Sequence, residues 1–315
     1  MAQTFRKTFS LPNFDVIRWF PGHMAKSMGQ MQSQLKNTDC VIEIHDARIP
    51  FSGRNPRFSD MIALRPHILL LNKFDLCNKG LKGKVADKLH CMGVENVLFT
   101  NCLEFRTKEI QTELMPMIFN AINSRPRYRK SVDYNIMVIG VPNTGKSTFI
   151  NAFRRMHTTR KRNVAQTGAI AGITRSVNNR IKVHFNPDMF LVDTPGILTP
   201  YIPNIDSGMR LSLCGCLPDH LVGEHYIVDY MLYWLNKQKR FSYIEKFELQ
   251  EPTDNVMSFL SHIAKQQSMV KKIKDINNPQ FQHVFKPNFE QAAQYALKIF
   301  RKGQLGNFTI DSDLL

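Results

Sequence analysis

Short runs of apolar, often branched residues recur along the first two thirds of the chain, mostly followed by loop residues and a helix-compatible stretch. The runs cover residues 41–45, 67–71, 97–100, 134–140, 181–185 and 189–192. Such runs are typical of buried strands, and their alternation with helices predicts an α/β fold with a mostly parallel sheet and helices on both faces. Ligands of such folds bind at the carboxyl ends of the strands.

The pattern changes after about residue 203, where the strand-like runs cease. Apolar positions then fall at helical spacing in residues 228–236, 256–263 and 289–300, which predicts a second, helical domain. Residues 124–131 combine a proline with four basic residues, which indicates an exposed connection between two halves of one sheet. We therefore expect an N-terminal extension at 1–18, an α/β domain at 19–205 and a helical domain at 206–315.

The charge of the chain indicates the kind of partner. It carries 42 Lys and Arg against 26 Asp and Glu, a formal net charge of +16. A globular fold does not need this excess, and polyanions are attracted to it. The basic residues are also locally concentrated, as in 125–130 and 154–162. Nucleic acid is therefore the favoured partner, and general solubility is the alternative interpretation.

Cysteine spacing, the length of the apolar runs and the N-terminal residues indicate the cellular compartment. Six cysteines show no repeated CxxC spacing of the kind that indicates zinc or a disulfide framework, which favours a reducing compartment. No apolar run approaches the roughly 20 residues needed to cross a bilayer. The first fourteen residues contain Arg6, Lys7 and hydroxyl side chains but no acid, as organellar transit segments do and as a disordered cytosolic start also does.

Residues 140–147, GVPNTGKS, match the phosphate-binding pattern GxxxxGK[ST] between an apolar strand and an amphipathic helix, the context that this motif requires. Gly140 and Gly145 permit the tight backbone path that points amide groups at phosphates. We expect Lys146 to bridge the β- and γ-phosphates and to serve catalysis, and Ser147 to ligate Mg²⁺. The neighbouring residues that we also assign to nucleotide binding are Asn143, Thr144 and Thr148.

Two further segments are expected beside the phosphates. Asp193 opens the DTPG motif after an apolar strand, so its carboxylate would reach Mg²⁺ through water, while the amide of Gly196 would meet the γ-phosphate. The long basic segment 157–175 ends in GIT, where Thr174 would close over Mg²⁺ and the γ-phosphate and take part in catalysis. A disordered linker is the alternative interpretation of that segment.

A guanine-recognition motif, NKFD, follows the strand at 67–71. The carboxylate of Asp75 can accept from two guanine donors, whereas adenine offers the wrong pattern, so the site selects GTP over ATP. Asn72 would tie the base loop to the phosphate loop, and the stem of Lys73 would cover the ring plane. The residues that follow the next strand and would contact the guanine oxygen are Thr100, Asn101 and Cys102.

The order of these motifs, with NKFD before GVPNTGKS, resembles that of the circularly permuted GTPases. WFPGHMAKS at 19–27 and HDARIPFSGRNP at 45–56 are similar to the YlqF/RbgA family, and most similar to its mitochondrial ribosome-associated members. The resemblance covers residues 19 to about 210, and the helical tail agrees with the family in placement and length without carrying a motif. Permutation preserves the sheet if the original termini are close together.

The resemblance also bears on catalysis. Many GTPases orient the attacking water with a Gln just after DxxG, but here that position is Ile197, so intrinsic hydrolysis should be slow. The family hydrolyses GTP when the ribosome stimulates it, which implies His23 as the water-positioning residue; a structural or RNA-contacting His23 is the alternative. Asn143 resembles the asparagine that holds K⁺ in potassium-dependent GTPases. The residues given a structural and nucleotide-loop role, with no catalytic step, are His45, Asp46 and Arg48.

Charge and resemblance together predict a partner and a place. We expect GTP/GDP, Mg²⁺ and K⁺ as ligands, and a monomeric GTPase that acts in assembly of the mitochondrial large ribosomal subunit. The helical domain would bind rRNA, with Lys265, Lys271, Lys272 and Lys274 on phosphates or, alternatively, on a solvated helix face. We expect the protein in the mitochondrial matrix or peripherally on the inner membrane. Two other functions stay open: a GTP-occupied RNA-binding scaffold with little hydrolysis, and a GTPase that acts at a membrane surface.

Overall fold

The computed structural model describes residues 5–11, 29, 32–54, 62, 65–124, 133–157, 180–185, 187–193, 202–274 and 283–315. Contacts divide the chain into two compact units. The sheet unit comprises Arg18–Pro203, Cys214–Leu217 and Asn307–Leu315, and the helical unit comprises Met1–Ile17, Asn204–Leu213 and Pro218–Gly306. Each unit therefore combines segments that are far apart in sequence. The three domains expected above are instead consecutive stretches of the chain.

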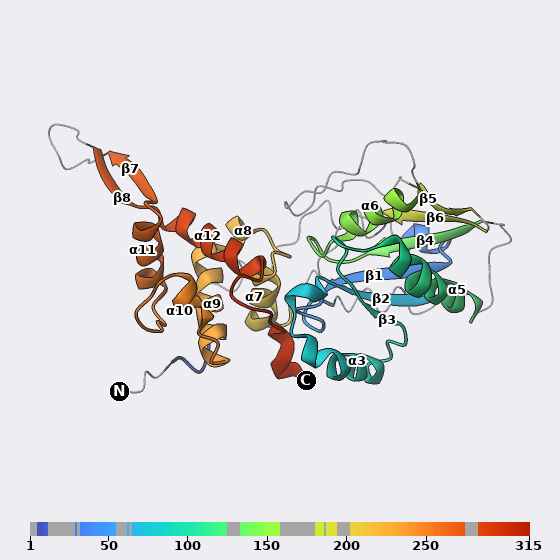
Figure 1. The fold of residues 1–315 in the computed structure, drawn as a ribbon, viewed down its shortest axis with the longest axis horizontal. Helices are drawn as coiled ribbons and strands as arrows, with labels where there is room; N and C mark the ends of the chain where they lie inside the picture. Colours follow the sequence, from blue (N-terminus) through green and yellow to red (C-terminus); the bar gives the residue numbers. More distant parts are fainter. Residues whose placement is uncertain are drawn as a thin grey trace. The chain divides into compact units, whose positions relative to one another are not determined.

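A six-stranded sheet forms the centre of the sheet unit (Figure 1). Its strands are β1 Cys40–Asp46, β2 His67–Asn72, β3 Val97–Phe99, β4 Tyr134–Ile139, β5 Arg180–Phe185 and β6 Asp188–Asp193, in the order β3-β2-β1-β4-β6-β5. All neighbouring pairs are parallel except β5 with β6. The six apolar runs therefore predict the six strands correctly, because the central strands β1, β2 and β4 are buried on both faces of the sheet and the outer strands keep buried residues such as Leu98 and Val183.

Helices cover both faces of this sheet, as predicted. On one face, Ile42 and Val138 belong to a core that also takes Ile118 of α5 and Phe153 of α6. On the other, Leu69 and Leu71 pack with Val85 and Leu89 of α3. The helices of the unit are α3 Lys82–Cys91, α4 Thr107–Glu109, the π-helical turn η4 Ile110–Leu114, α5 Met115–Asn123 and α6 Lys146–His157, with 3-10 turns η2 Phe74–Leu76, η3 Lys79–Leu81 and η5 Ile310–Leu314.

The helical unit is built around α9, whose apolar residues are buried on several sides and which packs against α7, α11 and α12. Its helices are α7 Ile205–Leu213, α8 Asp219–Val222, α9 Glu224–Lys237, α10 Ser242–Lys246, α11 Val256–Gln266 and α12 Phe289–Arg301. The three stretches with helical spacing lie in α9, α11 and α12, so these predictions are confirmed. Within the described residues, none of the helices is both long and apolar enough to span a bilayer.

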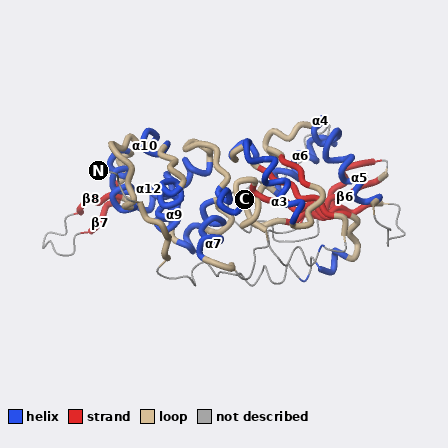
Figure 2. Tube along the Cα trace, turned by 90° about the horizontal axis from the view of Figure 1, so that it is seen from below, coloured by secondary structure: helices blue, strands red, loops and turns tan. Residues whose placement is uncertain are grey.

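The expectation that no strand follows residue 203 is wrong. β7 Val270–Lys274 and β8 His283–Pro287 form an antiparallel pair, the part of the helical unit drawn as strand in Figure 2. Ser268, in the left-handed region at φ 52°, ends the helical path before β7. The pair escaped the sequence pattern because VKKIK and HVFKP are half polar, and Val270 and Phe285, which are apolar, are exposed, unlike the central strands of the sheet. Of the connection expected at 124–131, only Ser124 is among the described residues.

Residues 5–11 of the N-terminal extension pack within the helical unit. The Arg6 guanidinium donates to both carboxylate oxygens of Asp229, at 3.1 and 2.8 Å, and its backbone amide donates to Asp254 at 2.9 Å. Phe9 lies edge-on to Tyr230, with ring centroids 5.1 Å apart. This part of the extension therefore has a structural role beside α9.

Candidate functional site

The loop between β4 and α6 has the conformation of a phosphate cradle. Gly140 lies at φ 149°, and a side chain there would overlap the carbonyl oxygen of Ile44, so only glycine fits. The hydroxyl of Thr144 and the ammonium of Lys146 both donate to the carbonyl of Val141, at 3.0 and 2.9 Å. Lys146 is buried, and its charge is thus held inside the loop where phosphates would lie.

Asn72 joins the guanine motif to this loop. Its side-chain amide donates to the carbonyl of Thr144 at 2.7 Å, and its side-chain oxygen accepts from the amide of Cys102 at 2.8 Å. Gly145 lies at φ 103° directly against Asn72, so a methyl group at Gly145 would overlap the side-chain amide. The structure therefore brings together three of the predicted segments: 72–75, 100–102 and 140–147.

Lys73 makes a second link between the same segments. It takes the left-handed conformation at φ 59°, and its ammonium donates to the carbonyl of Asn143 at 2.8 Å. The same nitrogen lies 2.9 Å from Asp46, which Arg48 holds with two further hydrogen bonds of 2.9 and 2.7 Å. Burial alone would raise the pKa of Asp46, but the charges of Arg48 and Lys73 hold it well below its usual range. Asp46 is thus a charged anchor for the guanine loop.

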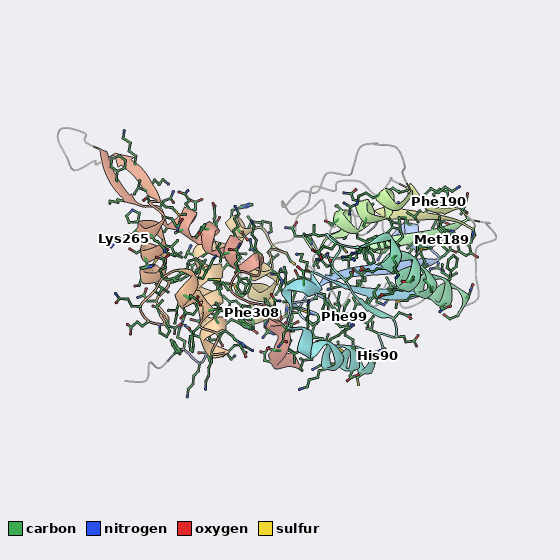
Figure 3. The ribbon with its side chains drawn as sticks, in the orientation of Figure 1. His90, Phe99, Met189, Phe190, Lys265 and Phe308 are labelled. Carbon is green, nitrogen blue, oxygen red and sulfur yellow. The ribbon has the colours of Figure 1, made fainter. Side chains whose placement is uncertain are left out.

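Asp75 and Thr100 supply unsatisfied polar atoms at the place expected for the base. Within the described residues, one carboxylate oxygen of Asp75 and the hydroxyl of Thr100 are buried without a hydrogen-bond partner. An unpaired buried acceptor is costly, and guanine donors would satisfy the carboxylate. The 3-10 turn that carries Asp75 is supported by Phe74 and Phe99, whose ring centroids are 5.0 Å apart; Phe99 is labelled in Figure 3. These residues fit a guanine nucleotide.

The sheet unit also contains two segments near these motifs, Cys214–Leu217 and Asn307–Leu315, which the sequence did not predict. The side-chain amide of Asn143 donates to the carbonyl of Gly215 at 2.8 Å, which fixes the segment Cys214–Leu217 against the phosphate loop. Cys214 and Cys216 are buried there, and burial raises the pKa of Cys216 to about 11. These side chains therefore act as small apolar groups, and no sequence pattern predicts their position.

The segment Asn307–Leu315 is the second part of the sheet unit that the sequence did not predict. The carboxylate of buried Asp311 accepts from the amides of Phe51 and Ser52, both at 2.8 Å, and from the Ser52 hydroxyl at 2.7 Å. The amide of Ile310 donates to the carbonyl of Arg48 at 2.7 Å. Phe308, labelled in Figure 3, donates its amide to the carbonyl of Leu76, at 3.0 Å, just after the guanine motif. The segment thus braces the loop after β1 and the turn that carries the guanine motif.

The residues expected to hold Mg²⁺ are only partly described. Ser147 and Thr148 lie in the first turn of α6, half-buried, and Asp193 ends β6 opposite Val138 of β4. Hydroxyl and carboxylate groups are ligands that Mg²⁺ prefers, and these lie on adjacent elements. No cluster of three ligating side chains is found in the described part of the chain. The predicted residues that lie outside the described part are His23, Thr174, Gly196 and Ile197.

Comparison with known proteins agrees with this site. A family model described as "50S ribosome-binding GTPase" matches residues 135–285, which include the phosphate loop but not the guanine motif at 72–75. That absence is expected if the guanine motif has moved ahead of the phosphate loop. A crystal structure of GNP-bound YlqF from T. maritima shares the fold, with a TM-score of 0.57 and 20% identity over 90% of this chain and 97% of that one.

Curated relatives match along nearly the whole length. Mouse "Mitochondrial ribosome-associated GTPase 1" is 43% identical over 99% of this chain and 95% of its own length. "Mitochondrial GTPase 1" of Aedes aegypti is 45% identical over 99% of each chain, and "Ribosome biogenesis GTPase A" of Bacillus cereus is 29% identical over 94% of each. With a guanine site and a phosphate loop joined through Asn72, the chain belongs to the circularly permuted P-loop GTPases of the YlqF/RbgA family, with its mitochondrial ribosome-associated members.

Proposed function

We propose that this GTPase binds the large subunit of the mitochondrial ribosome, acts in its assembly, and hydrolyses GTP to GDP and phosphate to gate its binding or release. The observation that carries the proposal is the match over 99% of the chain to relatives named for the mitochondrial ribosome, because it includes both units. The net charge of +16 supports rRNA as the surface it meets. A nucleotide site braced by two segments that are distant in sequence, 214–217 and 307–315, suits a protein whose affinity depends on the bound nucleotide.

The proposal assigns roles to the residues around the phosphates. Ser147, Thr174 and Asp193 would hold Mg²⁺, which neutralises charge that develops on the β- and γ-phosphates. Lys146 would leave the carbonyl of Val141 and donate to the same phosphates. Asn143 would hold K⁺; equal turnover in Na⁺ and K⁺ would remove that assignment.

Water positioning falls to His23 in this proposal, since Ile197 has no hydrogen-bonding group. His23→Ala should then keep GDP affinity but lose most of the turnover that the large subunit stimulates. Normal stimulated turnover in His23→Ala would mean that the residue only supports structure or RNA binding.

Turnover with and without purified mitochondrial large subunits tests the function itself. We expect slow hydrolysis alone and a rise of at least about tenfold with subunits, whereas small subunits should leave the rate unchanged. A GTP-occupied scaffold would bind the large subunit equally well but show the same slow rate. Binding to anionic vesicles that persists in excess rRNA would instead favour action at a membrane surface.

Asp75→Asn tests the base site separately. The new amide replaces one acceptor by a donor, which opposes guanine but suits xanthine, whose C2 carbonyl accepts. We expect GTP affinity to fall about 100-fold and XTP affinity to rise. The matched control is Asp87→Asn on α3, in the same unit but outside the motif, which should change neither affinity.

We also propose that the protein is mitochondrial, acts as a monomer in the matrix or peripherally on the inner membrane, and keeps most of its N-terminal extension. Arg6 and Phe9 pack against Asp229 and Tyr230, contacts that cleavage near residue 18 would remove. N-terminal sequencing of the protein from purified mitochondria should find a start before Phe5. A start beyond Leu11 would contradict retention.

A further inference from the structure

The β7–β8 hairpin of the helical unit presents an unusual combination of side chains. It extends from the end of α11, where Lys265 is labelled in Figure 3, and Figure 1 shows it projecting beyond the helices of its own unit. Among the described side chains of the two strands, Phe285 is 65% exposed and Val270 is 56% exposed. Lys271, Lys272 and Lys286 are exposed as well. These side chains of the hairpin therefore lie outside the core of the unit.

Two lysines of the hairpin face each other across the strands. Lys271 and Lys286 are paired in the register, so their side chains lie directly opposite on one face. Like charges in this arrangement destabilise a hairpin, and none of the described carboxylates is within ion-pair distance of either ammonium group. An arrangement that costs stability in the free protein is understandable if an anion neutralises it in a complex.

The opposite face combines charge with an aromatic ring. Lys272 is paired with Phe285, and by strand alternation Val270 shares their face. A solvated ring beside an ammonium group offers a stacking surface for a base and a partner for its phosphate. Duplex RNA hides its base faces in the stack, so this face fits only unpaired nucleotides. A hydrophobic protein partner would not need positive charge on both faces.

We infer that the β7–β8 hairpin binds an unpaired RNA segment, with Phe285 stacked on a base and with Lys271, Lys272 and Lys286 on neighbouring phosphates. The inference deepens the proposed function, on which it rests, because it names the surface and the state of the RNA that the helical unit recognises. Lys265, at the end of the helix that leads into β7, extends the same basic surface. Recognition is by stacking and charge, and sequence preference is weak.

The test uses the full-length protein and a fluorescent 12-nucleotide oligouridylate, with a 12-base-pair RNA duplex for comparison. We expect the single strand to bind more tightly, and Phe285→Leu to weaken it about 5- to 150-fold because a leucine side chain cannot stack. Phe285→Tyr keeps the ring and should restore binding. Because Phe285 is exposed, neither change should alter the thermal unfolding midpoint.

Charge is tested by its salt dependence. Each of Lys271→Ala, Lys272→Ala and Lys286→Ala should reduce the slope of log K against log salt by about 0.7. Lys246→Ala, which removes an exposed lysine from α10 of the same unit, is the matched control and should leave the slope unchanged. Equal single-strand binding by wild type, Phe285→Leu and Phe285→Tyr would overturn the inference. Equal affinity of the wild type for the single strand and the duplex would also overturn it, as would displacement of the RNA from the protein by anionic vesicles.

The outcome separates the inference from the proposed function. If wild-type turnover rises with large subunits while Phe285→Leu binds the single strand normally, only the hairpin assignment fails. If Phe285→Leu loses single-strand binding but subunits do not stimulate wild-type turnover, the hairpin assignment stands and the ribosomal function fails.

Discussion

In the sheet unit, Asn72, Lys73 and Asp311 are at least partly buried, and each meets two or three partners of the same unit. In the hairpin of the helical unit, Lys271 and Lys286 lie exposed and opposite each other. The first arrangement fixes a site before a small ligand arrives, which lowers the cost of binding it. The second leaves positive charge without a neighbouring negative charge until a large anionic partner binds. One chain thus combines a prearranged small-ligand site with an exposed charged surface for a large partner.

Gly145→Ala should have the largest effect on the prearranged nucleotide site. The methyl group would displace the Asn72 side chain, so that two buried hydrogen bonds are lost at about 1–3 kcal/mol each. Affinity for a fluorescent GDP analogue should fall at least about 30-fold. Gly93→Ala is the control, since Gly93 also has a positive φ but has open space around it; it should cost about 1–2 kcal/mol of stability with unchanged affinity. Normal GDP binding by Gly145→Ala would mean that Asn72 does not link the motifs.

The next effect concerns the segment that returns to the sheet unit. Asp311→Asn keeps the shape but removes a buried charged acceptor from the amides of Phe51 and Ser52. We expect a loss of about 2 kcal/mol of unfolding free energy, seen as a midpoint lower by about 4–8 °C in thermal denaturation. Asp87→Asn, at an exposed position of α3 in the same unit, should lie within about 1 °C of wild type. Equal midpoints of the two variants would argue against a bracing role.

The corresponding segment of the helical unit should matter less. Arg6→Ala removes the ion pairs with Asp229 and Asp254, but the Arg6 side chain is 35% exposed, so water screens them. We expect a loss of about 1 kcal/mol in urea unfolding followed by tryptophan fluorescence. Lys7→Ala removes an exposed neighbouring lysine and should be neutral. A loss as large as that of Asp311→Asn would erase the contrast between the units.

The smallest effect has the opposite sign. Lys271→Glu replaces a like-charged cross-strand pair by an opposite-charged one, so the free protein should gain about 0.2–1 kcal/mol. Hydrogen exchange of the β7 and β8 amides should slow accordingly, although the same change weakens RNA binding. Lys246→Glu on α10, with no lysine opposite, controls for net charge. Faster exchange in Lys271→Glu would mean that the two ammonium groups do not repel each other in the free protein.

The sequence predicts the sheet unit well, for a physical reason. Its central strands β1, β2 and β4 are buried on both faces and therefore mostly apolar, and the motifs at 72–75 and 140–147 need particular residues at short spacing. It does not predict Asp311, because a carboxylate that accepts from Phe51 and Ser52 satisfies no local pattern. The segment Cys214–Leu217 escapes for the same reason, since its place is set by Asn143 across the fold. Contacts between residues that are distant in sequence produce no periodic pattern from which they could be predicted.

The hairpin shows a different limit. Val270 and Phe285 are apolar but exposed, and lysines alternate with them, so neither helical nor buried-strand spacing applies. The sequence predicts that Lys271 and Lys272 meet phosphates, which stays a prediction, and the alternative of a solvated helix face is wrong because both residues lie on β7. Composition thus indicates a basic surface here, whereas the strands that carry it leave no recognisable pattern in the sequence.

Asp311 has a consequence for the order in which the protein folds as it is made. Its hydroxyl partner Ser52 lies 259 positions earlier. At roughly 5–20 residues per second, a ribosome needs about 13–52 s to cover that stretch. The last segment of the helical unit ends at Gly306, so the whole unit emerges before residues 307–315. The part of the protein whose guanine motif is synthesised first is therefore the last to be closed.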